Sequence, residues 1–123
     1  MLNDKTADYW KQIAQHDIDT FSLLIKEKGH PDIIIYHIHQ AIEKIIKSKI
    51  IENNGTFPYI HKLTRLYQIL CSLNEEFNGI FEQIMKIEAF SNNLRYPQSD
   101  FLNLSSQQEA LDAYNTICKN LNF

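Results

Sequence analysis

The chain has 123 residues, 44% of them hydrophobic, and a formal net charge of −3 at pH 7. This size predicts a single domain over residues 1–123, and the hydrophobic content excludes global disorder. The acidic balance argues against a protein that grips nucleic acid through a broad basic surface, but it does not exclude one local basic pocket for a phosphate.

The N-terminal part predicts a long amphipathic helix from about Thr6 to Lys28. Its apolar residues recur at three- and four-residue spacing and form one stripe, namely Trp10, Ile13, Ala14, Phe21, Leu24 and Ile25. Asp17 lies inside this stripe. Because an unpaired carboxylate is costly to bury, we expect Asp17 to be buried and bonded to a polar side chain of another helix. The candidates are Lys44, Arg95, His39 and Tyr96.

A turn at Gly29 and Pro31 precedes a second helix, predicted from about Asp32 to Glu52. One face of this helix is apolar and consists of Ile34, Ile38, Ala41, Ile42, Ile45 and Ile46. The opposite face carries the polar residues Tyr36, Gln40, Glu43, Lys44 and Lys47, with His37 and His39 at its borders. This mixture of imidazole, amide, carboxylate and ammonium groups is more varied than a helix needs to be soluble.

Residues 53–58 contain Asn, Gly and Pro and break the second helix. A third helix is predicted from about Tyr59 to Leu73, with Ile60, Leu63, Leu66, Tyr67 and Leu70 facing inward. Asn74 and the two acids after it predict the start of a fourth helix. Its apolar residues are Phe77, Ile80, Phe81, Ile84, Ile87 and Phe90.

Residues 92–104 predict an irregular polar loop that holds Arg95, Tyr96 and Pro97. Ser106 and Glu109 have capping-box spacing, which predicts the start of the last helix. Its stripe consists of Ala110, Leu111, Tyr114, Ile117, Cys118 and Leu121. Five amphipathic helices with short connections predict an all-α fold, an antiparallel helical bundle with one added helix.

The cysteines and the apolar runs indicate a cellular location. Cys71 and Cys118 are too few for a disulfide framework or a metal motif, and both are expected to be buried thiols. No apolar run approaches the ~18 residues of a membrane span, and the N-terminal residues contain no apolar signal region. We therefore expect a cytoplasmic protein that does not bind membranes.

The polar face of the second helix has two interpretations. Glu43 and Lys47 have the i,i+4 order of a weak surface ion pair, which is typical of a solvated face. Lys44 and Lys47 share a face with Gln40, so two ammonium groups and an amide are placed to meet one anion. The histidines and the glutamine favour a ligand- or partner-binding surface.

The remaining candidates carry no recognisable catalytic or metal motif. His37 and His39 diverge on a helix, which makes them a poor metal pair. His61 is predicted in the first turn of the third helix, where it is a polar surface residue or a base. Arg95 either satisfies carbonyls at a helix end or clamps an anion. No phosphate-binding glycine loop or nucleophile elbow is present, so we predict no catalytic residue, metal or cofactor.

Several short segments, taken in order, resemble the HEPN family of small helical domains. They are Tyr9-Trp10, Asp17, the segment His39 to Lys44 with Lys47, Pro58 with His61-Lys62-Leu63, and Arg95-Tyr96-Pro97. The resemblance implies an up-and-down four-helix bundle with a short extra helix and a homodimer. Aromatic residues in loops or at helix starts are candidate interface anchors, namely Phe57, Tyr59 and Phe101.

The chain departs from the ribonuclease members of that family, which carry an arginine followed within a few residues by a histidine. Arg65 and Arg95 are the only arginines, and the last histidine is His61. The resemblance then implies the non-nuclease branch, a module that binds a nucleotide or phosphate ligand, or a minimal nucleotidyltransferase partner, in a toxin–antitoxin-like or regulatory role. The predicted site residues are His39, Gln40, Glu43, Lys44, Lys47, His61, Arg95 and Tyr96.

Two alternatives stay open. One is an RNA-cleaving toxin with an altered site made of His39, His61 and Arg95. The other is a structural homodimeric adaptor whose polar face is solvated.

Overall fold

A computed structural model describes residues 5–95 and 102–123, without the side chain of Arg95. Within these residues the chain forms α-helices and one short 3-10 helix, and no β-strand is present, which confirms the all-α class. In chain order the elements are α1 (Ala7–Lys26), α2 (Pro31–Glu52), α3 (Leu63–Leu73), the 3-10 helix η1 (Glu75–Phe77), α4 (Phe81–Arg95) and α5 (Leu104–Leu121).

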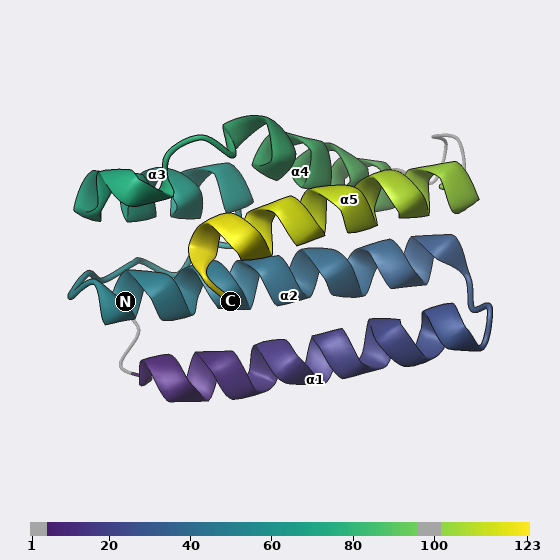
Figure 1. The fold of residues 1–123 in the computed structure, drawn as a ribbon, viewed down its shortest axis with the longest axis horizontal. Helices are drawn as coiled ribbons and strands as arrows, with labels where there is room; N and C mark the ends of the chain where they lie inside the picture. Colours follow the sequence, from purple (N-terminus) through teal and green to yellow (C-terminus); the bar gives the residue numbers. More distant parts are fainter. Residues whose placement is uncertain (1–4, 96–101) are drawn as a thin grey trace.

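Helix α2 is the centre of the arrangement. It contacts α1, α3, α4 and α5, whereas the main contacts of α1 are with α2 alone. Figure 1 shows α1 lying along one side of α2, with α5 along another side and the turn between α1 and α2 at one end. The helix therefore has one face toward α1 and another toward the three later helices.

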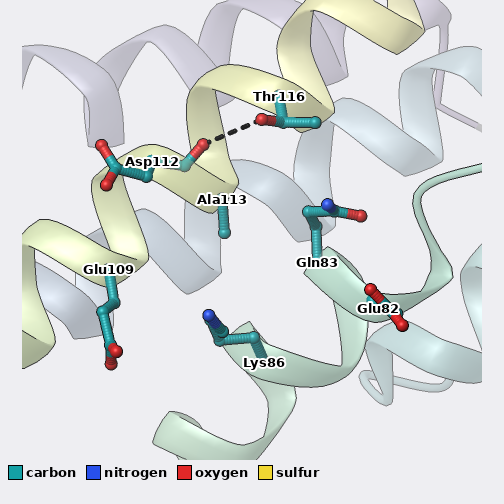
Figure 2. Close-up of a pocket in the computed structure, with 7 residues that line it drawn as sticks. All are labelled: Glu82, Gln83, Lys86, Glu109, Asp112, Ala113 and Thr116. Atoms are coloured by element: carbon teal, nitrogen blue, oxygen red, sulfur yellow. Dashed lines mark hydrogen bonds between the residues drawn. The ribbon is translucent and has the colours of Figure 1, made fainter.

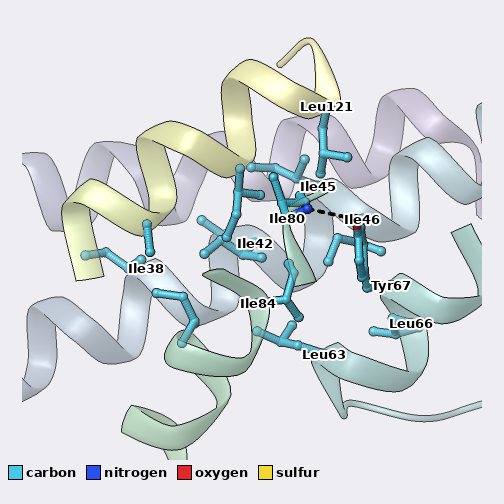
Figure 3. Close-up of a cluster of buried hydrophobic side chains, with 14 of the residues drawn as sticks. Ile38, Ile42, Ile45, Ile46, Leu63, Leu66, Tyr67, Ile80, Ile84 and Leu121 are labelled. Atoms are coloured by element: carbon cyan, nitrogen blue, oxygen red, sulfur yellow. Dashed lines mark hydrogen bonds between the residues drawn. The ribbon is translucent and has the colours of Figure 1, made fainter. Parts of the chain in front are cut away.

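The hydrophobic core lies between α2 and the later helices. Ile38, Ile42 and Ile45 of α2 are fully buried there, as are Leu63 and Ile84 of the facing elements (Figure 3). The regular spacing of β-branched residues along α2 produces this continuous apolar face. Ile80 donates its backbone N–H to the hydroxyl of Tyr67 (3.3 Å), and that hydroxyl donates in turn to the carbonyl of Phe77. This relay fixes the short connection between η1 and α4 against α3.

The third helix begins later than the sequence predicts. Helix α3 starts at Leu63, and the four residues before it are not helical. The backbone N–H of Ile60 donates to the carbonyl of Pro58 (2.8 Å), so the chain closes a tight turn where a helix would continue. As a result His61 lies in an exposed connecting segment, and Phe57, predicted as an interface anchor, is instead a core residue with 3% of its surface exposed.

The fourth helix also differs at both ends. Asn74 caps the 3-10 helix η1, accepting from the N–H of Glu76 (3.0 Å), and a separate helix α4 starts at Phe81 after Gly79 with φ = +110°. Phe81 is 40% exposed, so its predicted place in the core is wrong. Helix α4 continues to Arg95, which the sequence placed in a loop.

The start of α5 is set by Asn103 and not by Ser106. The Asn103 side chain accepts from the N–H of Ser106 (2.9 Å), and the Ser106 hydroxyl accepts from the N–H of Asn103 (3.3 Å). Ser106 therefore closes the capping box as its third helical residue. Cys71 and Cys118 are only partly buried. No helix in the described ranges is long and apolar enough to span a membrane.

Candidate functional site

Three residues of the polar face of α2 are buried, whereas Tyr36 of the same face is 47% exposed. Glu43 and His39 expose 4% of their surface, and Lys47 exposes 5%. This contradicts the interpretation of the face as solvated with weak ion pairs. Charged groups at this depth need partners, and three carboxylates, one each from α1, α2 and α4, provide them.

The first carboxylate is Asp17 of α1, which is 8% exposed. Lys44 of α2 donates to its Oδ2 (2.5 Å), and Nδ1 of His37 lies 3.0 Å from its Oδ1. Asp17 is therefore buried and bonded across the α1–α2 interface. Lys44 was among the partners that the sequence suggested, whereas His37 was not.

The second carboxylate is Glu43 of α2. Its Oε2 accepts from Nζ of Lys47 (2.9 Å) and lies 3.0 Å from Nδ1 of His61. The Lys47 ammonium also lies 4.9 Å from the ring centroid of Trp10 and 5.5 Å from that of Phe57. Cation–π attraction and the carboxylate together replace the water that this ammonium loses on burial.

The third carboxylate is Glu88 of α4, which the sequence analysis did not select. Its Oε1 accepts from the backbone N–H and the hydroxyl of Thr64 (both 3.3 Å), and its Oε2 lies 3.8 Å from Nε2 of His39. Burial opposes ionisation, but the attraction of His39 and the N–H groups of Thr64 and Leu63 outweighs it, so the pKa of Glu88 lies below its usual value. The available signal was its place next to Ile84 and Ile87 on the apolar face of α4.

Three cavities meet at His61, whose side chain is 65% exposed. The aromatic cavity, of about 210 Å³, is lined by Trp10, Gln40, Glu43, Lys44, Lys47, Phe57, Pro58, Tyr59 and His61. The polar cavity, of about 420 Å³, is lined by Tyr36, His39, Gln40, Glu43, His61, Ser91 and Leu94. The outer cavity, of about 380 Å³, is lined by His61, Lys62, Glu88 and Asn92.

A sequence model of the HEPN domain matches residues 7–122 of the chain. The chain belongs to the HEPN family. Comparison with curated proteins and with solved structures found no match. The matched range covers all the helices described above, and with them every residue that lines the three cavities of this HEPN domain.

Most of the predicted site residues line these cavities. Gln40 and Glu43 border both the aromatic and the polar cavity, Lys44 and Lys47 border the first, and His39 borders the second. Tyr96 and the side chain of Arg95 lie outside the described residues, as does Phe101, a predicted interface anchor. The sequence analysis gave no binding role to Trp10, Phe57, Lys62 or Glu88.

The anion site at Lys44 and Lys47 stays a prediction, and the structure shows that both ammonium groups are already paired. Each ammonium bonds a carboxylate, Lys44 with Asp17 and Lys47 with Glu43. An anion at either lysine therefore also meets the negative charge of that carboxylate. Lys62 of the outer cavity, in contrast, has no ion-pair partner among the described residues.

This HEPN domain has a separate groove between α4 and α5 that the sequence analysis did not predict. It measures about 220 Å³ and shares no lining residue with the other cavities (Figure 2). Its lining residues are Glu82, Gln83, Lys86, Glu109, Asp112, Ala113 and Thr116. In the two described ranges, no group of three or more His, Cys, Asp or Glu residues is arranged to hold a metal ion.

Proposed function

We propose that this chain is a non-catalytic HEPN module that binds a nucleotide through the buried polar face of α2 and the cavities beside it. One observation carries the proposal: buried charged residues of α2 form the walls of cavities that meet at the exposed His61. Burying the pair of Glu43 and Lys47 adds little to stability compared with apolar residues of the same size. Buried polar groups beside a cavity are characteristic of binding sites.

The phosphates of such a ligand would be met at the edge of the site. Lys62 and His61 line the outer cavity together with Glu88, whose carboxylate bonds Thr64 and faces His39, and Arg95 and Tyr96 stay predicted contributors. Lys44 and Lys47 hold the carboxylates of Asp17 and Glu43 and so shape the walls. In this proposal Lys44 and Lys47 of α2 have a structural role, and Lys62, just before α3, attracts the phosphates.

Thermal unfolding with AMP, ATP and a short RNA, at low and at physiological salt, tests the proposal. A ligand that binds only the folded state raises the midpoint with concentration. We expect AMP and ATP to raise it, and Lys62→Ala to weaken the effect of AMP. Lys86→Ala, an exposed lysine of the separate groove, is the matched control. A midpoint that no nucleotide changes would overturn the proposal.

A catalytic alternative is favoured by one observation. Nδ1 of His61 faces Glu43 at 3.0 Å, the arrangement by which a carboxylate orients an imidazole that acts as a base. RNA cleavage needs such a base beside the 2′-hydroxyl, whereas the arginine–histidine pair of the ribonuclease members is absent from the sequence. Metal-free RNA cleavage that disappears in His61→Ala or His39→Ala would establish this alternative.

Assembly is a second part of the proposal. We propose a homodimer, and a minimal nucleotidyltransferase as partner in a toxin–antitoxin-like or regulatory role, on the basis of the family alone. The cytoplasmic location stays the expectation drawn from the cysteines and the apolar runs. Sedimentation at micromolar concentration should give twice the chain mass of 14.5 kDa. A dimer whose stability no nucleotide changes would instead fit a structural adaptor.

The finer description of the fold belongs to the same proposal. An antiparallel up-and-down four-helix bundle with a short extra helix, formed by one domain over residues 1–123, is what the family resemblance implies.

A further inference from the structure

The charge balance of the aromatic cavity limits which part of a nucleotide can enter it. Its two ammonium groups are each bonded to a carboxylate, and Lys47 is also covered by the rings of Trp10 and Phe57. A phosphate placed there would meet the carboxylate of Glu43, which lines the cavity beside Lys47, and an ammonium of Lys44 that Asp17 already neutralises. Repulsion between like charges is strongest where water is scarce, so this cavity disfavours an anion.

The lining of the same cavity favours a flat ring. Trp10, Phe57 and Pro58 supply apolar surface, and Tyr59 supplies an aromatic ring that is 74% exposed and makes no ring contact with the described residues. A base gains free energy by stacking on such side chains, whatever its sequence identity. The exposed phenol of Tyr59 and the packed rings of Trp10 and Phe57 therefore suit a planar ligand.

Polar groups of the cavity suit the edge of a nitrogen heterocycle. The carboxamide of Gln40 forms no hydrogen bond with the described residues, and it offers a donor and an acceptor side by side. This is the pattern by which amide side chains read a base. The buried Nε1–H of Trp10 also lacks an acceptor in the described ranges, and an unpaired buried donor is costly.

We propose, on the basis of the function proposed above, that the aromatic cavity binds the uncharged base of the nucleotide and excludes its phosphates. The base stacks on Tyr59 and is read by Gln40. The phosphates remain outside, toward Lys62.

A competition experiment with parts of the ligand tests this assignment. The four common nucleosides, their 5′-monophosphates including AMP, ribose 5-phosphate and pyrophosphate are titrated into the full chain by calorimetry. We expect at least one nucleoside to bind, and its affinity to lie within about tenfold of that of its 5′-monophosphate. We expect ribose 5-phosphate and pyrophosphate not to displace it.

The outcomes separate the two proposals. Displacement of AMP by ribose 5-phosphate, together with no binding of any nucleoside, would overturn the base assignment and leave nucleotide binding intact. No binding of any of these probes, or of ATP, would overturn both.

Two substitutions test the proposed contacts, and Tyr59→Ala also locates the base, because Tyr59 lines the aromatic cavity whereas Gln40 lines the polar cavity as well. Tyr59→Ala and Gln40→Leu should each weaken nucleoside binding by about tenfold or more, the fold-change that loss of one stacking or edge contact produces. Phe123→Ala, which removes another exposed aromatic ring away from the cavities, is the matched control and should leave the affinity unchanged. The thermal midpoint of Tyr59→Ala without ligand checks that the fold is intact. A loss in Tyr36→Ala with none in Tyr59→Ala would place the base in the polar cavity and overturn the assignment.

Discussion

Both faces of α2 contain buried residues, but for different physical reasons. On one face Ile38, Ile42 and Ile45 are fully buried against the later helices. Removing such side chains from water is the main favourable contribution to folding. On the other face Glu43 and Lys47 are buried as an ion pair, where the loss of hydration roughly cancels the attraction. The apolar face therefore accounts for the fold, and the polar face carries the proposed binding site.

Removing one partner of the buried ion pair should have the largest effect on stability. Lys47→Met leaves Glu43 buried with His61 as its one partner among the described residues, so we expect the free energy of unfolding to fall by about 3–5 kcal/mol. The double variant Glu43→Leu/Lys47→Met removes both charges and should recover most of that loss. Urea unfolding of the two variants measures the difference. A single variant as stable as the natural chain would mean that the pair is hydrated.

The apolar face should respond in a different way. Ile42→Ala removes fully buried methyl groups and should lower the free energy of unfolding by about 2–5 kcal/mol. Ile33→Ala, on the same helix but 44% exposed, is the control and should change it by less than about 0.5 kcal/mol. We expect nucleotide affinity to be the same in both. Loss of nucleotide affinity in Ile42→Ala, measured under conditions where the variant is fully folded, would contradict the separate roles of the two faces.

Removing Asp17, the carboxylate that α1 contributes beside the polar face of α2, should have a smaller effect on stability. Asp17→Ala removes a carboxylate bonded to Lys44 and His37, and we expect a loss of about 1.5–3 kcal/mol in urea unfolding. Asp19→Ala, an exposed carboxylate of the same helix that bonds only Gln15, serves as the control. An unchanged urea midpoint for Asp17→Ala would show that this carboxylate is solvated.

The smallest expected effect is on the pH dependence of stability. The pKa of Glu88 is lower in the folded chain than its usual value, so its ionised form stabilises the fold. That contribution is present above the ordinary glutamate pKa of about 4.3 and is lost as the pH falls through the folded value. The urea midpoint of Glu88→Gln should therefore fall less steeply with acidification than that of the natural chain. Glu82→Gln, an exposed glutamate of α4, should retain the natural slope.

Periodicity predicted which residues share a helix face but not what covers that face. The isoleucines of α2 and the burial of Asp17 follow from spacing alone. The burial of Glu43 and Lys47 depends on Trp10 and Phe57, which reach them from α1 and from the connection after α2. No pattern within α2 contains that information, so the sequence alone also allowed a solvated polar face.

The ends of the elements were the least predictable part. Tyr59 to Lys62 have helical spacing with Leu63, and only the turn at Pro58 excludes them from α3. That turn determines the site, because it places His61 where the three cavities meet. Asn103 and Ser106 are both good caps, and the capping box uses the two together.

Trp10 is the single tryptophan of the chain, and it lies in the wall of the aromatic cavity. All of the indole fluorescence therefore originates beside the buried ammonium of Lys47 and the ring of Phe57. An indole changes its emission when its surroundings become drier or a ring stacks nearby. The natural chain thus carries its own optical reporter of this site, and a dye or a labelled variant is unnecessary for following occupancy in solution.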